Sequence, residues 1–282
     1  MLTAFPLSAE ALDRFVAEAL SEDVGAGDIT CQAVIPRTAT LTANIVAREN
    51  AIVCGLPLAQ AFFEKLDPQC SFAAMSQDGT AVDAGQSIAQ VKGVASALLT
   101  AERSALNILQ LLSGIATTAR TYVEAMGGAK AKLLDTRKTI PGYRLLSKYA
   151  TSCGGAVNHR IGLFDAIMIK GNHIATCGSV SSAIKAAVEA GHDQIQVECD
   201  TLEQADVAVS AGATSLLLDN MTPTMLRQAV QRFGGKIPLE ASGGVTLDSI
   251  RAIAETGVDF VSVGTALTLS AAAIDIGMDY DT

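Results

Sequence analysis

The sequence predicts an α/β fold whose second half is a β/α barrel, and two features of the chain support this. In the second half of the chain short apolar runs recur, and from Lys170 onward each step has the length of one strand, one helix and two loops. Each run ends in a charged residue or a glycine cluster. Uninterrupted apolar runs are typical of parallel strands that are buried on both faces. Because barrel strands end at one mouth, where the active sites of this fold lie, the run ends indicate the functional residues.

The composition is that of a globular protein and argues against several function classes. A chain of 282 residues with 49% hydrophobic and 17% charged residues can bury a sizeable core in one large or two modest domains. The net charge of −9 argues against nonspecific binding to nucleic acids or anionic membranes. No apolar run approaches the roughly 20 residues that a membrane span needs. We therefore expect no nucleic-acid or membrane partner.

The six cysteines indicate a reducing compartment rather than a disulfide or zinc framework. None of them forms a CxxC pair, so the spacing of zinc ligands is absent. No signal peptide is recognisable before them, and a chain of this size does not need disulfides. We expect free, mostly buried thiols and a cytoplasmic location.

The first 110 residues predict a small α+β domain. Ser8 is a typical N-cap for a helix to about Leu20, and a turn follows at residues 25–28. Alternating apolar residues then predict three strands, at 39–47, 51–54 and 87–94.

Three further helices complete the expected domain organisation. Apolar spacing predicts one helix over 100–114, with Arg103 in its early part, and a second over 115–126. The segment 269–278 has the pattern of an amphipathic helix that could pack back on the first domain. The expected domains are residues 1–110, joined by the C-terminal helix 269–282, and a barrel domain over 111–268.

Six apolar runs are expected to form the barrel strands. They include Leu133-Leu134, Ala166–Ile169, Ile195–Val197, Leu216–Leu218, Pro238–Ala241 and Phe260–Val263. The charged residues at or just after their ends are Arg137, Lys138, Lys170, Glu198 and Asp219. Cations and carboxylates gathered at one mouth predict an anionic substrate and a metal ion.

The first cations of the mouth point to anion binding. Arg137 and Lys138 follow a strand end and could clamp a phosphate or carboxylate, although solvated surface charge is the alternative. His159 and Arg160 lie in a glycine-rich loop, where freed backbone amides can also hold oxyanions. A structural hydrogen bond is the alternative for His159.

Lys170 ends an entirely apolar strand, so it is nearly buried unless it faces the mouth. It could pair with an anionic substrate or act as a Schiff-base nucleophile, which requires a neutral lysine. Carboxylates and anions are expected nearby and would keep this lysine charged, so the ion pair is favoured.

Glu198 and Asp219 end consecutive strands and have three candidate roles. They could act as acid and base, hold Mg²⁺ through hard oxygen ligands, or form structural ion pairs with lysines. With a phosphate-rich substrate the Mg²⁺ role fits best. The glycine turns Ser242-Gly243-Gly244 and Gly264-Thr265 lie where late barrel loops often bind phosphate.

Several motifs together make the chain resemble the quinolinate phosphoribosyltransferase family, nearly from end to end. The matching segments are Gly27–Thr30, Glu102–Asn107, Ser113–Thr117, Asp135–Thr139, Asn158–Asp165, Ile169–Ile174, Leu218–Asn220 and Leu239–Gly244. The resemblance implies phosphoribosyl transfer from phosphoribosyl pyrophosphate to quinolinate with decarboxylation, a step of NAD biosynthesis. It also implies an N-terminal α/β sandwich domain and an open, incomplete β/α barrel, as in type II phosphoribosyltransferases.

The resemblance further implies a homodimer and a role for each residue of the mouth. Arg103 would reach the active site of the partner subunit. Lys138, Glu198 and Asp219 would be catalytic and handle phosphoribosyl pyrophosphate, with Mg²⁺ on the two carboxylates. Quinolinate would be held by Arg137, His159, Arg160 and Lys170, beside Thr136. The 5′-phosphate would be bound by Ser242, Gly243, Gly244, Val263, Gly264 and Thr265.

The chain departs from the family pattern at the last phosphate loop, and three rival functions stay open. An extra Thr265 precedes Ala266, and Leu269 stands where the family usually has a basic residue. One rival is a paralogue associated with molybdate transport, which shares the fold but is disfavoured by the full set of cations. The others are a Schiff-base aldolase using Lys170 and a noncatalytic binding barrel, which the ring of charged strand ends disfavours.

Overall fold

The structure is a computed structural model, and it describes residues 4–280. Within this range the chain forms two compact units. Unit 1 contains the residues up to Arg120, Leu145–Gly155 and the residues from Ser270 onward. Unit 2 contains Thr121–Arg144 and Ala156–Leu269. The boundary that we expected near residue 110 thus lies at Arg120, and an additional internal segment joins the first unit.

Unit 1 is built on an antiparallel sheet with the strand order β12-β1-β5-β3. Its strands are β1 (Thr40–Ala47), β3 (Ser71–Ala74), β5 (Ser87–Val94) and β12 (Ile276–Tyr280). A separate pair consists of β2 (Ala51–Ile52) and β4 (Ala81–Val82). In β1, every second residue from Ala43 to Ala47 is fully buried, and this period of two explains why the segment is a strand.

Side-chain caps begin the first two helices of unit 1. Ser8 accepts a hydrogen bond from the Ala11 amide at 3.2 Å, as its N-cap prediction requires, and Asp28 accepts one from the Cys31 amide at 2.9 Å. The helices of this part of the chain are α1 (Ala9–Val24), α2 (Ile29–Val34), α3 (Leu56–Leu66) and α5 (Arg144–Cys153).

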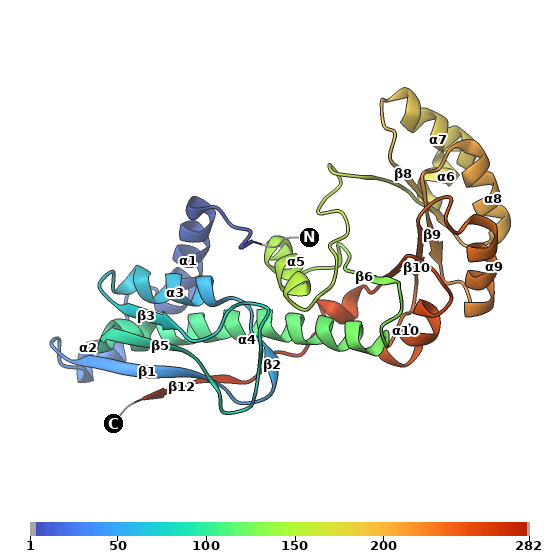
Figure 1. Cartoon of the computed structure of the whole chain (residues 1–282). Helices are drawn as coiled ribbons and strands as arrows, with labels where there is room; N and C mark the ends of the chain where they lie inside the picture. Colours follow the sequence, from blue (N-terminus) through green and yellow to red (C-terminus); the bar gives the residue numbers. More distant parts are fainter. Residues whose placement is uncertain (1–3, 281–282) are drawn as a thin grey trace. The chain divides into compact units, whose positions relative to one another are not determined.

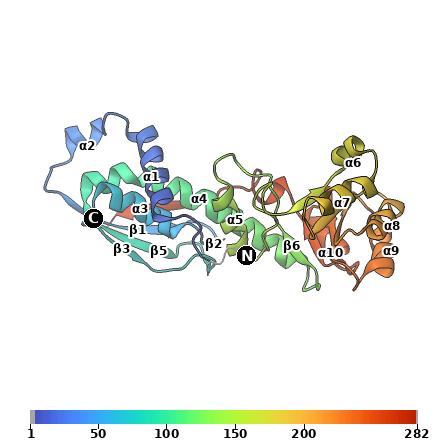
Figure 2. The same ribbon diagram turned by 90° about the horizontal axis from the view of Figure 1, so that it is seen from above.

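One long helix, α4 (Ala95–Ala125), stands where the sequence predicted two, so the predicted break at residue 114 is wrong. Gly114 is needed inside the helix because the chain at Ala272 passes against it, and a Cβ on Gly114 would overlap the Ala272 carbonyl oxygen. In unit 1 this helix runs roughly along the strands of the sheet (Figures 1 and 2). Within the described residues, no helix is long and apolar enough to cross a membrane.

The C-terminal segment is a strand, so the helix predicted over 269–278 is wrong. β12 pairs antiparallel with β1, with Tyr280 opposite Ala43 and Ile276 opposite Ala47. Ile274, Ile276 and Met278 are buried and two residues apart, which is the period of a strand. The segment belongs to unit 1, and residues 281–282 of the expected helix lie outside the described residues.

Unit 2 is a six-stranded parallel sheet with the order β6-β11-β10-β9-β8-β7. Its two edge strands β6 and β7 do not pair, so the barrel is open, and all six apolar runs form strands as predicted. Figure 1 shows α7, α8 and α9 side by side along one face of this sheet. The strands are β6 (Lys132–Leu134), β7 (Ile167–Ile169), β8 (Ile195–Cys199), β9 (Ser215–Asp219), β10 (Leu239–Ser242) and β11 (Phe260–Ser262). The helices are α6 (Gly171–Cys177), α7 (Val180–Glu189), α8 (Leu202–Ala211), α9 (Pro223–Phe233), α10 (Leu247–Ala254) and the 3-10 turn η1 (Thr265–Leu267).

The register of unit 2 brings the strand ends to one level. Ser242, the last residue of β10, lies opposite Asp219, the last residue of β9. At the β6 edge, Val157 forms an isolated bridge with Leu134, so the following loop starts beside the end of β6. Side chains that leave these ends therefore share one edge of the sheet.

Candidate active site

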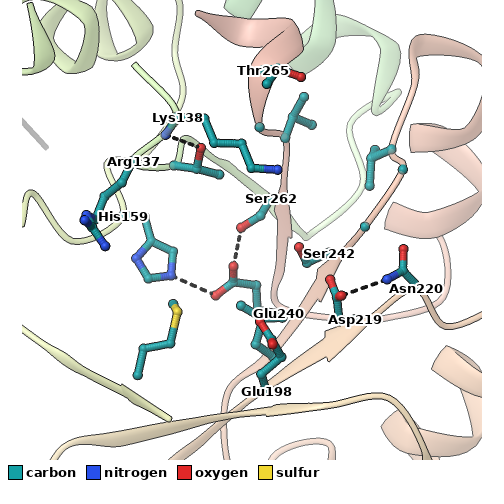
Figure 3. Close-up of a pocket in the computed structure, with 18 of the residues that line it drawn as sticks. Arg137, Lys138, His159, Glu198, Asp219, Asn220, Glu240, Ser242, Ser262 and Thr265 are labelled. Atoms are coloured by element: carbon teal, nitrogen blue, oxygen red, sulfur yellow. Dashed lines mark hydrogen bonds and ion pairs between the residues drawn. The ribbon is translucent and has the colours of Figure 1, made fainter. Parts of the chain in front are cut away.

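A cavity of about 670 Å³ opens at the carboxyl ends of the strands of unit 2. Figure 3 shows side chains from β8, β9, β10, β11, the segment that follows β6 and the loop after Val157 around it. Every predicted site residue of the barrel lines this cavity. They are Thr136, Arg137, Lys138, His159, Arg160, Lys170, Glu198, Asp219, Ser242, Gly243, Gly244, Val263, Gly264 and Thr265. Arg103 is exposed on α4, in unit 1.

The two arginines of the cavity repel each other, and the protein offsets the charge of Arg160 only in part, through Asp165. Burial, and then the nearby charge of Arg137, lower the pKa of Arg160. The Nε atom of Arg137 is buried and has no hydrogen-bond partner among the described residues. A buried donor without a partner is costly, and two neighbouring guanidinium groups repel each other. Both effects would be relieved by an anion bound between them.

A buried carboxylate holds the two cationic segments together. Asp135 has no exposed surface, and it accepts hydrogen bonds from the His159 amide and from Asn158 Nδ2, both at 2.8 Å. It therefore ties the end of β6 to the loop that carries His159 and Arg160. This one side chain therefore fixes the segment that carries Arg137 relative to the loop that carries Arg160.

Lys138 and its neighbours shape the opposite wall. The Lys138 amide donates to Thr136 Oγ1 at 3.1 Å. The Lys138 side chain lies against Gly264, where an added Cβ would stand 3.0 Å from Cδ and 3.2 Å from Nζ. Gly264 thus leaves the space that this lysine occupies. The extra Thr265 begins the turn η1 and lines the cavity, and Leu269 is 48% exposed.

The carboxylates of the cavity already have partners. Glu198 forms an ion pair with Lys170, and Asn220 Nδ2 donates to Asp219 Oδ2 at 2.7 Å. Asn220 has a φ of 54°, and its side chain lies so close to Gly243 that a Cβ there would overlap Asn220 Oδ1. The glycine turn after β10 therefore permits the close approach of Asn220, which in turn orients Asp219.

The donor set fits a magnesium ion that arrives with a phosphate ligand. No group of three or more His, Cys, Asp or Glu side chains within residues 4–280 could hold a metal by itself. Glu198 and Asp219 nevertheless offer hard oxygen atoms on the wall of one cavity. Mg²⁺ is commonly bound by one or two carboxylates together with substrate phosphates.

Sequence reasoning missed Glu240, which lies at the centre of the site. This β10 residue is only 3% exposed, yet it lines the cavity. Burial opposes its ionisation, but hydrogen bonds from His159, Ser262 and Gln196 outweigh it and lower the pKa of the Glu240 carboxyl. Lys170 was selected because it is a charged residue at an apolar run, and Glu240 is a charged residue within such a run. The sequence therefore contained the signal for Glu240.

Comparison with known proteins assigns the chain to a family. Its sequence matches the N-terminal domain of quinolinate phosphoribosyl transferase over residues 28–113 and the C-terminal domain over residues 115–279. The chain belongs to the quinolinate phosphoribosyltransferase family. The α/β fold with an open barrel, which the sequence resemblance implied, is confirmed.

Individual members of the quinolinate phosphoribosyltransferase family cover nearly the whole chain. The probable nicotinate-nucleotide pyrophosphorylase [carboxylating] of Bacillus subtilis (strain 168) is 44% identical, over 92% of this chain and 89% of its own. Quinolinate phosphoribosyltransferase [decarboxylating] 1 of Nicotiana glauca is 40% identical, over 94% and 81%. The solved structure of the nicotinate-nucleotide pyrophosphorylase from Francisella tularensis has a TM-score of 0.93 at 41% identity and covers 98% of both chains.

The ion pair of Lys170 bears on the rival aldolase function. Lys170 Nζ is engaged in an ion pair with Glu198, whereas a Schiff-base nucleophile needs a neutral amine. The geometry therefore agrees with family membership and disfavours covalent catalysis by this lysine.

Proposed function

We propose that the protein transfers the phosphoribosyl group of phosphoribosyl pyrophosphate to quinolinate with loss of CO₂. The products are nicotinate mononucleotide and pyrophosphate, and the enzyme is a pentosyltransferase of NAD biosynthesis. Family membership supports this reaction, and the single observation that carries it in the site is the incompletely balanced arginine pair Arg137 and Arg160. Quinolinate is a dianion, so it offers one carboxylate for each of two cations. We expect the enzyme to work in the cytoplasm.

The arginines and their neighbours would bind the pyridine dicarboxylate. Arg137 and Arg160 present planar donor groups that match carboxylates, and Lys170 adds a third cation on the same cavity. The His159 ring lines the wall beside Arg160 and belongs to the same binding surface. Thr136 contributes a hydroxyl that also orders the backbone of Lys138.

The other wall would bind phosphoribosyl pyrophosphate. Lys138 would contact its phosphates, and the backbone amides of the two glycine turns would hold the 5′-phosphate. These turns contain Ser242, Gly243 and Gly244, and Val263, Gly264 and Thr265. Glu198 and Asp219 would hold Mg²⁺. When bound, Mg²⁺ supplies positive charge that stabilises the departing pyrophosphate.

The chemistry needs charge stabilisation more than proton transfer. Cleavage of the bond from ribose C1 to pyrophosphate leaves positive charge on the ribose, and the carboxylate of Glu198 or Asp219 would stabilise it. The pyridine nitrogen then forms the new bond to C1. The 2-carboxylate leaves as CO₂, its electron pair stays on ring carbon 2 beside the cationic nitrogen, and a proton from solvent completes that carbon.

We further propose a homodimer in which Arg103 completes the site of the partner subunit. Arg103 is exposed on α4 and has no assigned role within its own unit. A third arginine would add positive charge to a site that binds a ligand with two carboxylates.

A coupled assay tests the reaction directly. Purified protein is incubated with phosphoribosyl pyrophosphate, Mg²⁺ and either quinolinate or nicotinate, and release of CO₂ and pyrophosphate is followed. We expect both products in equal amounts with quinolinate. Pyrophosphate release without CO₂, or no turnover of quinolinate, would overturn the proposed function.

A further inference from the structure

Glu240 is a buried charge in the cavity that the reaction above does not use. Its Oε2 atom accepts from Gln196 Nε2 at 2.6 Å and faces His159 Nε2 at 3.2 Å, and its Oε1 atom accepts from Ser262 Oγ. Figure 3 shows the chain of interactions from His159 through Glu240 to Ser262 across the base of the cavity. These side chains come from β10, β8, β11 and the loop after Val157. One carboxylate thus joins four separate segments of unit 2.

The hydrogen bonds of His159 fix the position of its proton. The Arg160 amide donates to His159 Nδ1 at 2.7 Å. A backbone amide can only donate, so Nδ1 must offer a lone pair, and the ring proton lies on Nε2. The Nε2 hydrogen then points to the Glu240 carboxylate, which can only accept. Both nitrogen atoms of the ring are therefore committed to orienting bonds.

The His159 side chain is only 14% exposed, but packing does not enclose it completely. His159, Arg160 and Glu240 line the main cavity and also a second cavity of about 400 Å³. The second cavity is bordered by residues from the amino ends of the strands, among them Ser215, Pro238 and Phe260. The two hydrogen bonds therefore add to packing in fixing the orientation of the ring.

We propose that Glu240 is a positioning residue for quinolinate binding: it holds His159 as the Nε2-protonated tautomer, and His159 Nδ1 in turn fixes the backbone of Arg160. The idea rests on the proposed function, because it assigns the ligand of Arg160 as quinolinate. Glu240 itself touches no substrate in this scheme. Its effect reaches the substrate through two hydrogen bonds and the guanidinium group of Arg160.

Nitrogen-15 NMR of the histidine rings tests the tautomer without any substrate. The chain has three histidines, so the spectra are simple to assign. His173 is a built-in reference, since its Nδ1 accepts from the Lys170 amide at 2.9 Å. In the wild-type protein we expect the His159 signals of a protonated Nε2 and an unprotonated Nδ1. A protonated Nδ1 or an averaged mixture of tautomers in the wild type would overturn the proposal.

Three variants separate positioning from general damage. Glu240→Ala removes the acceptor and should change the His159 signals while those of His173 stay constant. Glu240→Gln keeps an oxygen toward His159 and should retain most of the wild-type tautomer. Ser262→Ala removes a bond to the other oxygen of the carboxylate and should leave the His159 tautomer unchanged.

Kinetics provide the second readout. Outer partners that orient metal-binding histidines are commonly worth about 10- to 100-fold, and by analogy Glu240→Ala should raise the KM for quinolinate by about tenfold or more. The KM for phosphoribosyl pyrophosphate should change little, and Glu240→Gln should recover most of the loss. An equal rise of both KM values, or no change in either, would overturn the positioning role. If the wild type does not turn over quinolinate, the proposed function fails, whereas the NMR result still decides the role of Glu240.

Discussion

Two sides of the candidate cavity differ in how their charges are balanced. The arginine side, Arg137 and Arg160, has a buried Nε without a partner among the described residues and a guanidinium whose pKa is lowered by burial and by its neighbour. The carboxylate side, Glu198 and Asp219, is already paired with Lys170 and Asn220. An anion can therefore bind to the arginine side without first displacing another partner. The carboxylate side must exchange existing partners before it can bind a cation.

This difference predicts where binding energy comes from. An anion that reaches the arginine side relieves a penalty that is already present in the free protein. A metal ion that reaches the carboxylate side competes with an ammonium and an amide, so its net gain is smaller. Changes on the arginine side should consequently have the larger effects, and changes on the carboxylate side the smaller ones.

The sharpest test is a substrate that lacks one carboxylate. Nicotinate would leave one cation of the arginine side unpaired. A site that is built to bind a polar group can reject an analogue without that group by about 10⁴-fold. We expect kcat/KM for nicotinate to be lower than for quinolinate by about 10³-fold or more. Competition assays with both compounds measure the ratio. Comparable turnover of the two would mean that the arginine side serves another ligand.

Removal of one arginine should have the next largest effect. Arg137→Ala should lower kcat/KM for quinolinate by about 10²- to 10³-fold, since truncation of a buried charged partner costs on the order of 2–5 kcal/mol. The KM for phosphoribosyl pyrophosphate should stay near the wild-type value. Lys185→Ala is the matched control, because the Lys185 side chain is 77% exposed and outside the cavity. A loss below threefold for Arg137→Ala would contradict the unbalanced-charge argument.

The proposed dimer extends the arginine side across subunits, and mixed dimers test it. Arg103→Ala and Lys138→Ala homodimers should each be nearly inactive, with Arg103 contributing about 2–5 kcal/mol if its contact is buried. After mixing and re-pairing, activity should rise to about a quarter of wild type, because half of the dimers are mixed and each has one intact site.

The control for this experiment is the physical presence of mixed dimers. Two different affinity tags on the variants allow the mixed species to be purified and assayed alone. Mixed dimers without activity would show that Arg103 acts within its own subunit or not at the site.

The carboxylate side should give the smallest effects on binding. Glu198→Ala and Asp219→Ala should each weaken binding of phosphoribosyl pyrophosphate by about tenfold, since each removes one proposed Mg²⁺ ligand. Isothermal titration with and without Mg²⁺ measures this, and activity should be lost in excess chelator. Asp200→Ala, a neighbouring exposed carboxylate, is the control. Full activity with chelator present would remove the metal role.

The strands of unit 2 were predictable because their signal is local. Runs such as Leu216–Leu218 are buried on both faces, and such runs read as continuous apolar segments. The charged residues that follow them line one cavity because parallel strands share an edge, so most of the candidate site followed from the same pattern.

The failures arose where distant parts of the chain decide local structure. Gly114 has a low helix propensity, but it lies inside α4 to make room for the Ala272 carbonyl oxygen, a contact that the sequence does not show. The segment at Ile276 is a strand because β1 offers it a partner more than two hundred positions away in the chain. Glu240 is a different case, because its carboxylate inside an apolar run was visible in the sequence and only its three hydrogen-bond donors come from distant segments.

The pairing of β1 with β12 also has a consequence for synthesis of the protein. The ribosome completes β1 early, whereas β12 emerges only after all of unit 2 has been made. At about 5–20 residues per second, one edge of β1 stays without its neighbour on the order of ten seconds or longer. An open strand edge can recruit other chains, so the nascent protein should be most prone to aggregation at this stage, and slower translation should prolong it. Moving the β12 segment ahead of β1 by circular permutation should shorten that vulnerable interval and reduce aggregation during expression.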